Sequence, residues 1–139
     1  MHWPRVTTDR SGTAAVEFAI VAPIFLMMLM SLIGYGIFLS ASHAIQQIAA
    51  DAARTAVAGL TLDERVMLVR SFIDRATLDY AFIDRRDLVV NLAGDAADPS
   101  QFTVTLSYDA GDLPIWNMYA FAMPERTITR FSTIRLGGL

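Results

Sequence analysis

The 139-residue sequence contains no cysteine, no lysine and only two histidines. The absence of cysteine excludes disulfide scaffolds, thiol catalysis, iron–sulfur clusters and cysteine-based zinc sites. All 11 basic residues are arginines, and the 14 acidic residues bring the net charge to −3. Because non-specific binding to nucleic acid depends on a basic surface, this charge argues against nucleic acid as a partner.

Charged residues are scarce, at 18%, while 54% of the residues are hydrophobic and the mean hydropathy is +0.41. The apolar residues are concentrated in residues 18–39, where 18 of 22 are hydrophobic, and no charged residue occurs between Glu17 and Asp51. As a helix these residues span about 33 Å, enough to cross a hydrocarbon core of about 30 Å. We therefore predict a transmembrane helix at about residues 18–39.

A cleaved secretory signal peptide is the alternative reading of this apolar run. The run is longer than the apolar region of a signal peptide, although small residues at 40–44 could form a cleavage site. Against cleavage there, no glycine or proline occurs from Ser40 to Ala58, and helical periodicity continues to Ala58. We expect one helix over residues 13–58, with an amphipathic second half. Its polar side comprises His43, Gln47, Asp51 and Arg54.

Charge on the two sides of the span predicts its orientation. Arg5 and Arg10 precede the span, and Arg54 follows it. Arginines are enriched on the cytoplasmic side of membrane spans, so we expect a cytoplasmic N-terminus and an extracytoplasmic C-terminal part.

Glu17 lies at the edge of the apolar run, where a charge is costly and usually has a partner or a function. If the chain were cut after Gly12, the new amino group of Thr13 would lie four residues before Glu17. That amine could then pair with the carboxylate of the same or a neighbouring subunit. Alternatively, Glu17 is a first-turn carboxylate stabilised by the helix dipole and hydrated by headgroups.

These residues resemble the type IV pilin-like proteins, and specifically the TadE-like pseudopilins of the tight-adherence (Tad/Flp) pilus. The resemblance rests on Gly12, on Glu17 and Phe18 at the fifth and sixth positions after it, and on Pro23 in the apolar run. It extends to the alanine-rich residues 48–56, and a similar Thr/Ser-rich strand at residues 127–135 closes many such chains.

The resemblance implies that residues 1–12 are a leader, removed by a prepilin peptidase between Gly12 and Thr13. Glu17 and Phe18 would then serve subunit pairing and assembly. The implied function is a minor pilin-like subunit in the assembly of a Tad/Flp-type pilus for surface adhesion. The implied partners are the inner membrane, the peptidase, other pilin or pseudopilin subunits and the Tad assembly platform. Pro23 would ease extraction of the subunit from the bilayer or would only kink the helix.

We predict a small extracytoplasmic α+β domain over residues 59–139, and the resemblance implies that it is of the pilin-like class. Thr61 and Glu64 form a capping-box pattern that opens a second helix, which we expect to end near Tyr80. Strand candidates follow at residues 88–92, 102–108 and 127–136, and residues 102–108 alternate most clearly. A helix packed on a small antiparallel sheet and braced against the first helix is the expected arrangement.

The sequence contains no catalytic constellation, so we expect neither an enzyme nor a cofactor. His43 has no HExxH pattern or nucleophile elbow nearby, and we expect it to be solvated. Two aspartate pairs in loops could supply oxygen ligands for calcium, but aspartates also cap turns and no EF-hand spacing exists. These pairs are Asp95 with Asp98 and Asp109 with Asp112.

The apolar loop 113–123 contains Trp116 and Tyr119. Such residues are mostly core, but these two could instead form a surface that meets another pilin-like subunit, since aromatic residues are enriched at interfaces. The alternative function for the whole chain is an uncleaved single-span membrane protein whose periplasmic domain binds another partner or ligand.

Overall fold

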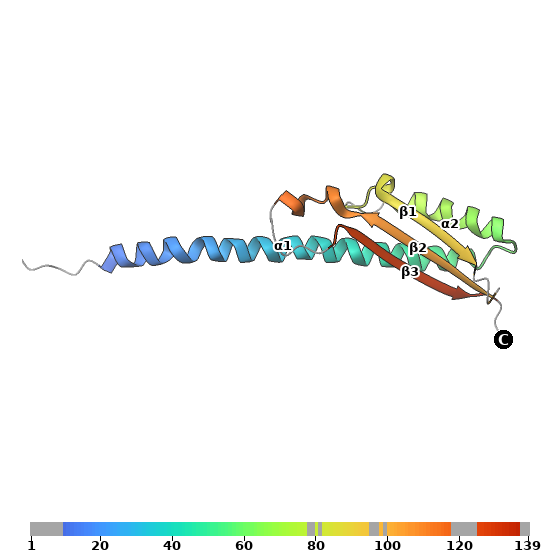
Figure 1. The fold of residues 1–139 in the computed structure, drawn as a ribbon, viewed down its shortest axis with the longest axis horizontal. Coiled ribbons are helices and arrows are strands. Elements are labelled where there is room, and N and C mark those ends of the chain that lie inside the picture. The colour runs from blue at the N-terminus through green and yellow to red at the C-terminus, as the bar shows by residue number, and fades with distance from the viewer. Residues whose placement is uncertain are drawn as a thin grey trace, which may run out of the picture.

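The computed structural model describes residues 10–77, 80, 82–94, 98, 100–117 and 125–136. Figure 1 shows one long helix, α1, whose C-terminal half is covered by the other elements and whose N-terminal half projects alone. This arrangement confirms the predicted α+β fold. The elements are α1 (Arg10–Ala56), α2 (Leu62–Ala76), β1 (Leu88–Gly94), β2 (Gln101–Asp109) and β3 (Thr127–Arg135), with 3₁₀ helices η2 (Arg85–Asp87), η3 (Ala110–Asp112) and η4 (Pro114–Asn117).

Helix α1 runs for 47 residues without interruption. Its sequence is dominated by alanine, leucine, isoleucine and methionine, most of which favour helix. The helix ends in a tighter turn, where the N–H groups of Val57, Ala58 and Gly59 bond to carbonyls three residues earlier. It thus stops two residues before the predicted end. At the other end α1 begins at Arg10, before the expected leader boundary.

Helix α2 begins as the sequence predicts. The Thr61 hydroxyl accepts a hydrogen bond from the Glu64 N–H at 3.2 Å, and the Glu64 carboxylate accepts one from the Thr61 N–H at 3.2 Å. The predicted end near Tyr80 is wrong, because α2 ends at Ala76. Thr77 follows as a buried cap whose hydroxyl donates to the Ile73 carbonyl at 3.0 Å. A side-chain bond of this kind competes with the next helical turn.

The three strands form an antiparallel sheet in the order β1-β2-β3. All three predicted strands are present, and β1 extends two residues further than expected because Gly94 pairs with Phe102. Alternation on β2 is complete and puts one row of side chains against α1. That buried row is Phe102, Val104, Leu106 and Tyr108.

Small residues of α1 form the seam on which the domain packs. Ala49, Ala52, Ala53 and Ala56 are completely buried, so the sheet and α2 can approach the helix backbone closely. Larger side chains from both sides fill the remaining space, as in Ile45 of α1. The predicted amphipathic character of the second half of α1 is therefore confirmed.

The other face of the sheet is polar, and its hydroxyl groups pair across the strands. Thr103 and Thr133 lie 2.8 Å apart through their hydroxyl oxygens, and Ser107 and Thr129 lie 3.2 Å apart. Phe131 is an exception on this face, with 65% of its surface exposed. Cross-strand pairs of this kind add modestly to sheet stability.

Two phenylalanines on neighbouring strands allow a matched test of the core. We expect Phe102→Ala to lower the free energy of unfolding by about 3–5 kcal/mol, because Phe102 is completely buried. Phe131→Ala, at the exposed position, should change it by about 0.5 kcal/mol or less. Denaturant unfolding of the full chain in detergent, followed by circular dichroism, measures both. Equal effects would show that Phe102 is not a core residue.

Candidate membrane-anchoring and assembly segment

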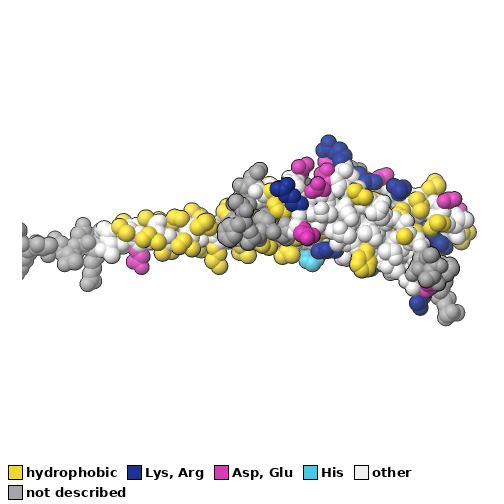
Figure 2. All heavy atoms as spheres, viewed as in Figure 1, with side chains coloured by type: hydrophobic (Ala, Val, Ile, Leu, Met, Phe, Trp, Pro, Cys, Tyr) yellow, Lys and Arg dark blue, Asp and Glu magenta, His cyan; other side chains and the backbone are white. Residues whose placement is uncertain are grey.

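The N-terminal half of α1 carries its apolar side chains on the outside. From residue 12 to residue 33 none of its residues is buried, and Phe18 is 72% exposed. Figure 2 shows this half as a narrow apolar rod beside the mixed surface of the domain. The helix is long and apolar enough to cross a membrane, which is consistent with a membrane-anchored single-pass protein.

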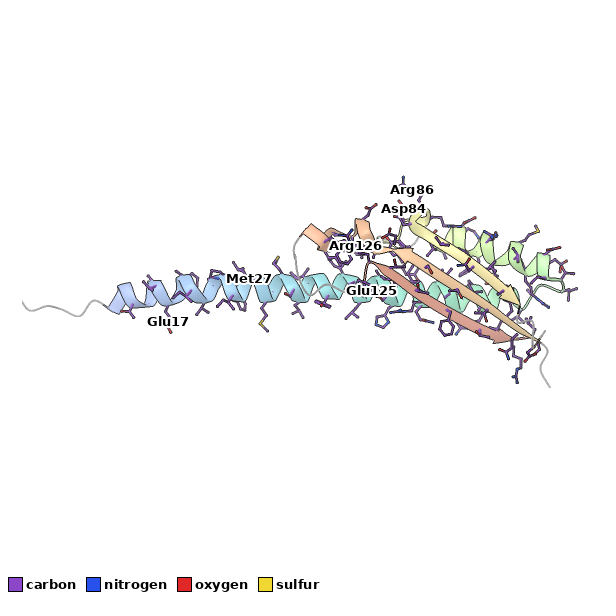
Figure 3. The ribbon with its side chains drawn as sticks, in the orientation of Figure 1. Glu17, Met27, Asp84, Arg86, Glu125 and Arg126 are labelled. Atoms are coloured by element: carbon purple, nitrogen blue, oxygen red, sulfur yellow. The ribbon has the colours of Figure 1, made fainter. Side chains whose placement is uncertain are left out.

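Glu17 is the acidic side chain on this rod, and Figure 3 shows it pointing away from the helix axis, far from the domain. It lies seven residues into α1, which begins at Arg10. The helix dipole acts mainly within the first turn, so in the uncut chain it does not account for the position of this carboxylate. A helix beginning at Thr13 would bring Glu17 within about one turn of the new N-terminus.

Gly12 and Thr13 both lie within α1 and are exposed. Thr13 and Glu17 are four residues apart and therefore lie on the same face of the helix. A Cβ atom added at Gly12 would meet no atom within 4 Å. The fold therefore does not require glycine at this position.

Pro23 lies inside α1, and the helix continues through it (Figure 1). Loss of one backbone N–H is tolerated in apolar helices, where local adjustments satisfy the freed carbonyl. Among the small residues of α1, Ala15 and Ala19 are exposed, whereas Gly34 is buried by the domain. Gly34 therefore packs against the domain of its own chain.

The domain overlaps the C-terminal end of the predicted span. A Cβ added at Gly34 would lie 3.8 Å from the Ile115 Cβ of η4. Ile37 and Phe38 pack partly buried against the same core. The stretch of α1 that nothing in the described structure covers therefore ends near Ile33, before the predicted limit at residue 39.

Trp116 is half-buried beside this overlap. Its indole N–H donates a hydrogen bond to the Ala110 carbonyl, and the guanidinium of Arg126 lies 5.3 Å from the ring centroid. The ring also packs against the hydrophobic core. Tyr119 lies outside the described residues, so the interface expected for Trp116 and Tyr119 stays a prediction.

Among the polar candidates, Asp98 and Asp109 bond within the chain and His43 is solvent-exposed. His43 lies on α1. Asp98 accepts hydrogen bonds from Ser100 and Gln101, and Asp109 accepts one from the Gly111 N–H at 2.9 Å. Asp95 lies outside the described residues. Within the part of the chain that the structure describes, no three His, Asp or Glu side chains gather as they would around a metal ion.

A surface groove of about 550 Å³ lies between the end of α2 and η3, a feature that sequence reasoning did not find. The Tyr108 hydroxyl in its wall donates to the Phe82 carbonyl at 2.9 Å. Hydrogen bonds from Arg86 lower the pKa of the Asp84 carboxyl to about 2. Alternation on β2 placed Tyr108 on the buried face, but the segment before β1 carries no pattern that would predict the groove.

Comparison with known families places these features in context. Residues 12–54 match the family model of the TadE-like proteins. The match begins at Gly12 and covers nearly all of α1, and it confirms the resemblance seen in the sequence. It indicates a protein associated with the Tad pilus and its membrane machinery. No curated protein and no solved structure matches the chain.

Asp98 gives a pH-dependent test of the turn before β2. Hydrogen bonds from Ser100 and Gln101 lower the pKa of its carboxyl below the ordinary 3.8. Its contribution to stability is therefore complete above 3.8 and is lost as the pH falls through the lowered value. We expect Asp98→Asn to unfold at a lower temperature than the unmodified chain at neutral pH, with the gap closing in strong acid. Thermal unfolding across this pH range measures the gap, and a gap independent of pH would contradict the assignment.

Proposed function

We propose that this protein is a minor pilin-like (pseudopilin) subunit that takes part in assembly of a Tad/Flp-type pilus for surface adhesion. Its role is structural, without catalysis. The observation that carries the proposal is α1, an unbroken 47-residue helix with a bare apolar half that bears Glu17 and Phe18. The TadE-like match over residues 12–54 supports it, because it covers this same element.

In the proposed mechanism the bare half of α1 holds the subunit in the inner membrane, with the N-terminus in the cytoplasm and the domain in the periplasm. A prepilin peptidase removes the leader by cutting between Gly12 and Thr13. The new amino group of Thr13 then pairs with Glu17 of a neighbouring subunit. This pairing neutralises two charges that are costly in an apolar environment.

The exposure of the apolar half fits exchange between two environments. Lipid tails and the apolar helices of neighbouring subunits offer similar surroundings to side chains such as Phe18, which is 72% exposed. The subunit could then pass from membrane to filament without refolding α1. The partners in this scheme are other pilin or pseudopilin subunits and the Tad assembly platform.

Processing can be tested at Gly12. We expect Gly12→Ala to abolish or greatly reduce cleavage in cells that contain the peptidase, while the chain still folds, because an added Cβ meets no atom within 4 Å. Gly36→Ala is the matched control, since Gly36 is equally open and lies outside the cleavage region. Intact mass and N-terminal sequencing measure the result. If the chain without any substitution keeps Met1 in cells that contain the peptidase, the result would favour the uncleaved membrane protein instead.

Pairing can be tested at Glu17. A charge-assisted hydrogen bond is worth about 1.5–3 kcal/mol, so Glu17→Gln should lower incorporation into pili or subunit complexes about tenfold or more. Membrane insertion should not change, because the substitution makes the helix less charged. Glu125→Gln, at an exposed position of the domain, is the control. Quantitative immunoblots of membranes and sheared pili separate the two steps, and normal incorporation of the Glu17 variant would refute the pairing.

A further inference from the structure

One end of the domain lies directly against the apolar helix. Figure 1 shows η4 at the end of the domain nearest the bare half of α1. Ile115 of η4 contacts Gly34 at 3.8 Å, measured to a Cβ built on the glycine. Away from this contact, α1 still exposes apolar surface, because Tyr35 is 42% exposed and Leu39 is 53% exposed.

The length of the helix fixes the depth of this contact. From Glu17 to Gly34 the distance along the helix axis is about 26 Å. For a helix tilted by about 20°, the corresponding depth along the membrane normal is about 24 Å. The hydrocarbon core is about 30 Å thick. If Glu17 lies at one edge of the core, Gly34 and the η4 residues against it lie at or just inside the other edge.

The composition of η4 suits this depth. It comprises Pro114, Ile115, Trp116 and Asn117, and Pro114 is exposed. The indole N–H of Trp116 already bonds to the Ala110 carbonyl, so no polar group of the ring is left to satisfy in lipid. Tryptophan is enriched at the membrane interface, and an arginine can extend its charge toward the headgroups. Arg126 is exposed above the Trp116 ring, and Figure 3 shows Arg126 at the end of the domain nearest the bare half of α1.

We propose that η4, with Trp116, and Tyr35, which follows Gly34 in α1, lie at the boundary between the hydrocarbon core and the headgroup layer of the leaflet on the domain's side. The domain thus rests on the lipid surface while the subunit is in the membrane, and the surface formed by η4 and Tyr35 contacts phospholipid. Apolar surface continuous with the span and the 26 Å depth carry the proposal, with about 1.5 Å per residue as its scale. It depends on α1 crossing the bilayer and does not depend on cleavage or pilus assembly.

Tryptophan fluorescence tests the depth of η4. The chain has two tryptophans, so the full-length Trp3→Phe variant in phosphatidylcholine–phosphatidylglycerol vesicles reports on Trp116 alone. We expect quenching by lipids labelled near the headgroup, weaker quenching by lipids labelled deep in the chain, and protection from aqueous iodide. The control is Phe131→Trp in a chain without the native tryptophans, since position 131 is 65% exposed on the far side of the sheet. Its iodide quenching should be several-fold stronger.

A second measurement uses the absence of cysteine. Single cysteines at Pro114, Met28 and Asn91 can carry a spin label in an otherwise unlabelled chain. Met28 lies in the span and Asn91 on the exposed face of β1. Collision with oxygen relative to a water-soluble nickel complex should place Pro114→Cys between Met28→Cys and Asn91→Cys.

Two results would overturn the proposal. In one, Trp116 is quenched by iodide as strongly as the control and the label at 114 matches the label at 91. In the other, Trp116 is protected from iodide but insensitive to labelled lipid, which would assign its cover to protein. The quenching and spin-label measurements do not depend on cleavage or on pili. A failure of processing or of pilus assembly in cells would leave their outcome unchanged, so the two proposals can fail separately.

Discussion

The structure depends on one helix, α1, that continues without a break from a bare apolar half into a half packed within the domain. An α-helix satisfies its backbone hydrogen bonds internally, so α1 can pass from an apolar to a packed environment with no change of conformation. What changes is the partner of its side chains. Up to Ile33 the apolar residues face outward, and from Gly34 onward the face toward the domain is buried.

The core of the domain includes this helix. Sheet and α2 share the alanine seam of α1, in which Ala49, Ala52, Ala53 and Ala56 have no exposed surface. A region of about 80 residues is marginal as an independent fold, because a small domain buries a smaller fraction of its surface than a large one. Packing on α1 supplies the missing surface, and it also ties the position of the domain to that of α1.

Several elements could be predicted because their signals are local. The capping box of Thr61 and Glu64 marks the start of α2, and alternation marks β2. The far ends of elements were less predictable. The end of α2 depends on buried Thr77, and the extension of β1 depends on pairing of Gly94 with Phe102. The burial of Thr77 and the pairing of Gly94 are set by tertiary packing and strand pairing, which a pattern read along the chain does not show.

The candidate site divides in the same way. Gly12, Thr13, Glu17 and Phe18 lie within two turns of one helix, so their spacing alone determined their arrangement. The length and apolar character of the span were likewise properties of the sequence. Only the tertiary structure decided that Trp116 lies beside the C-terminal end of that span, since the contact of η4 with Gly34 joins segments far apart in the chain. Such a contact results from burial of the shared core, which no local periodicity encodes.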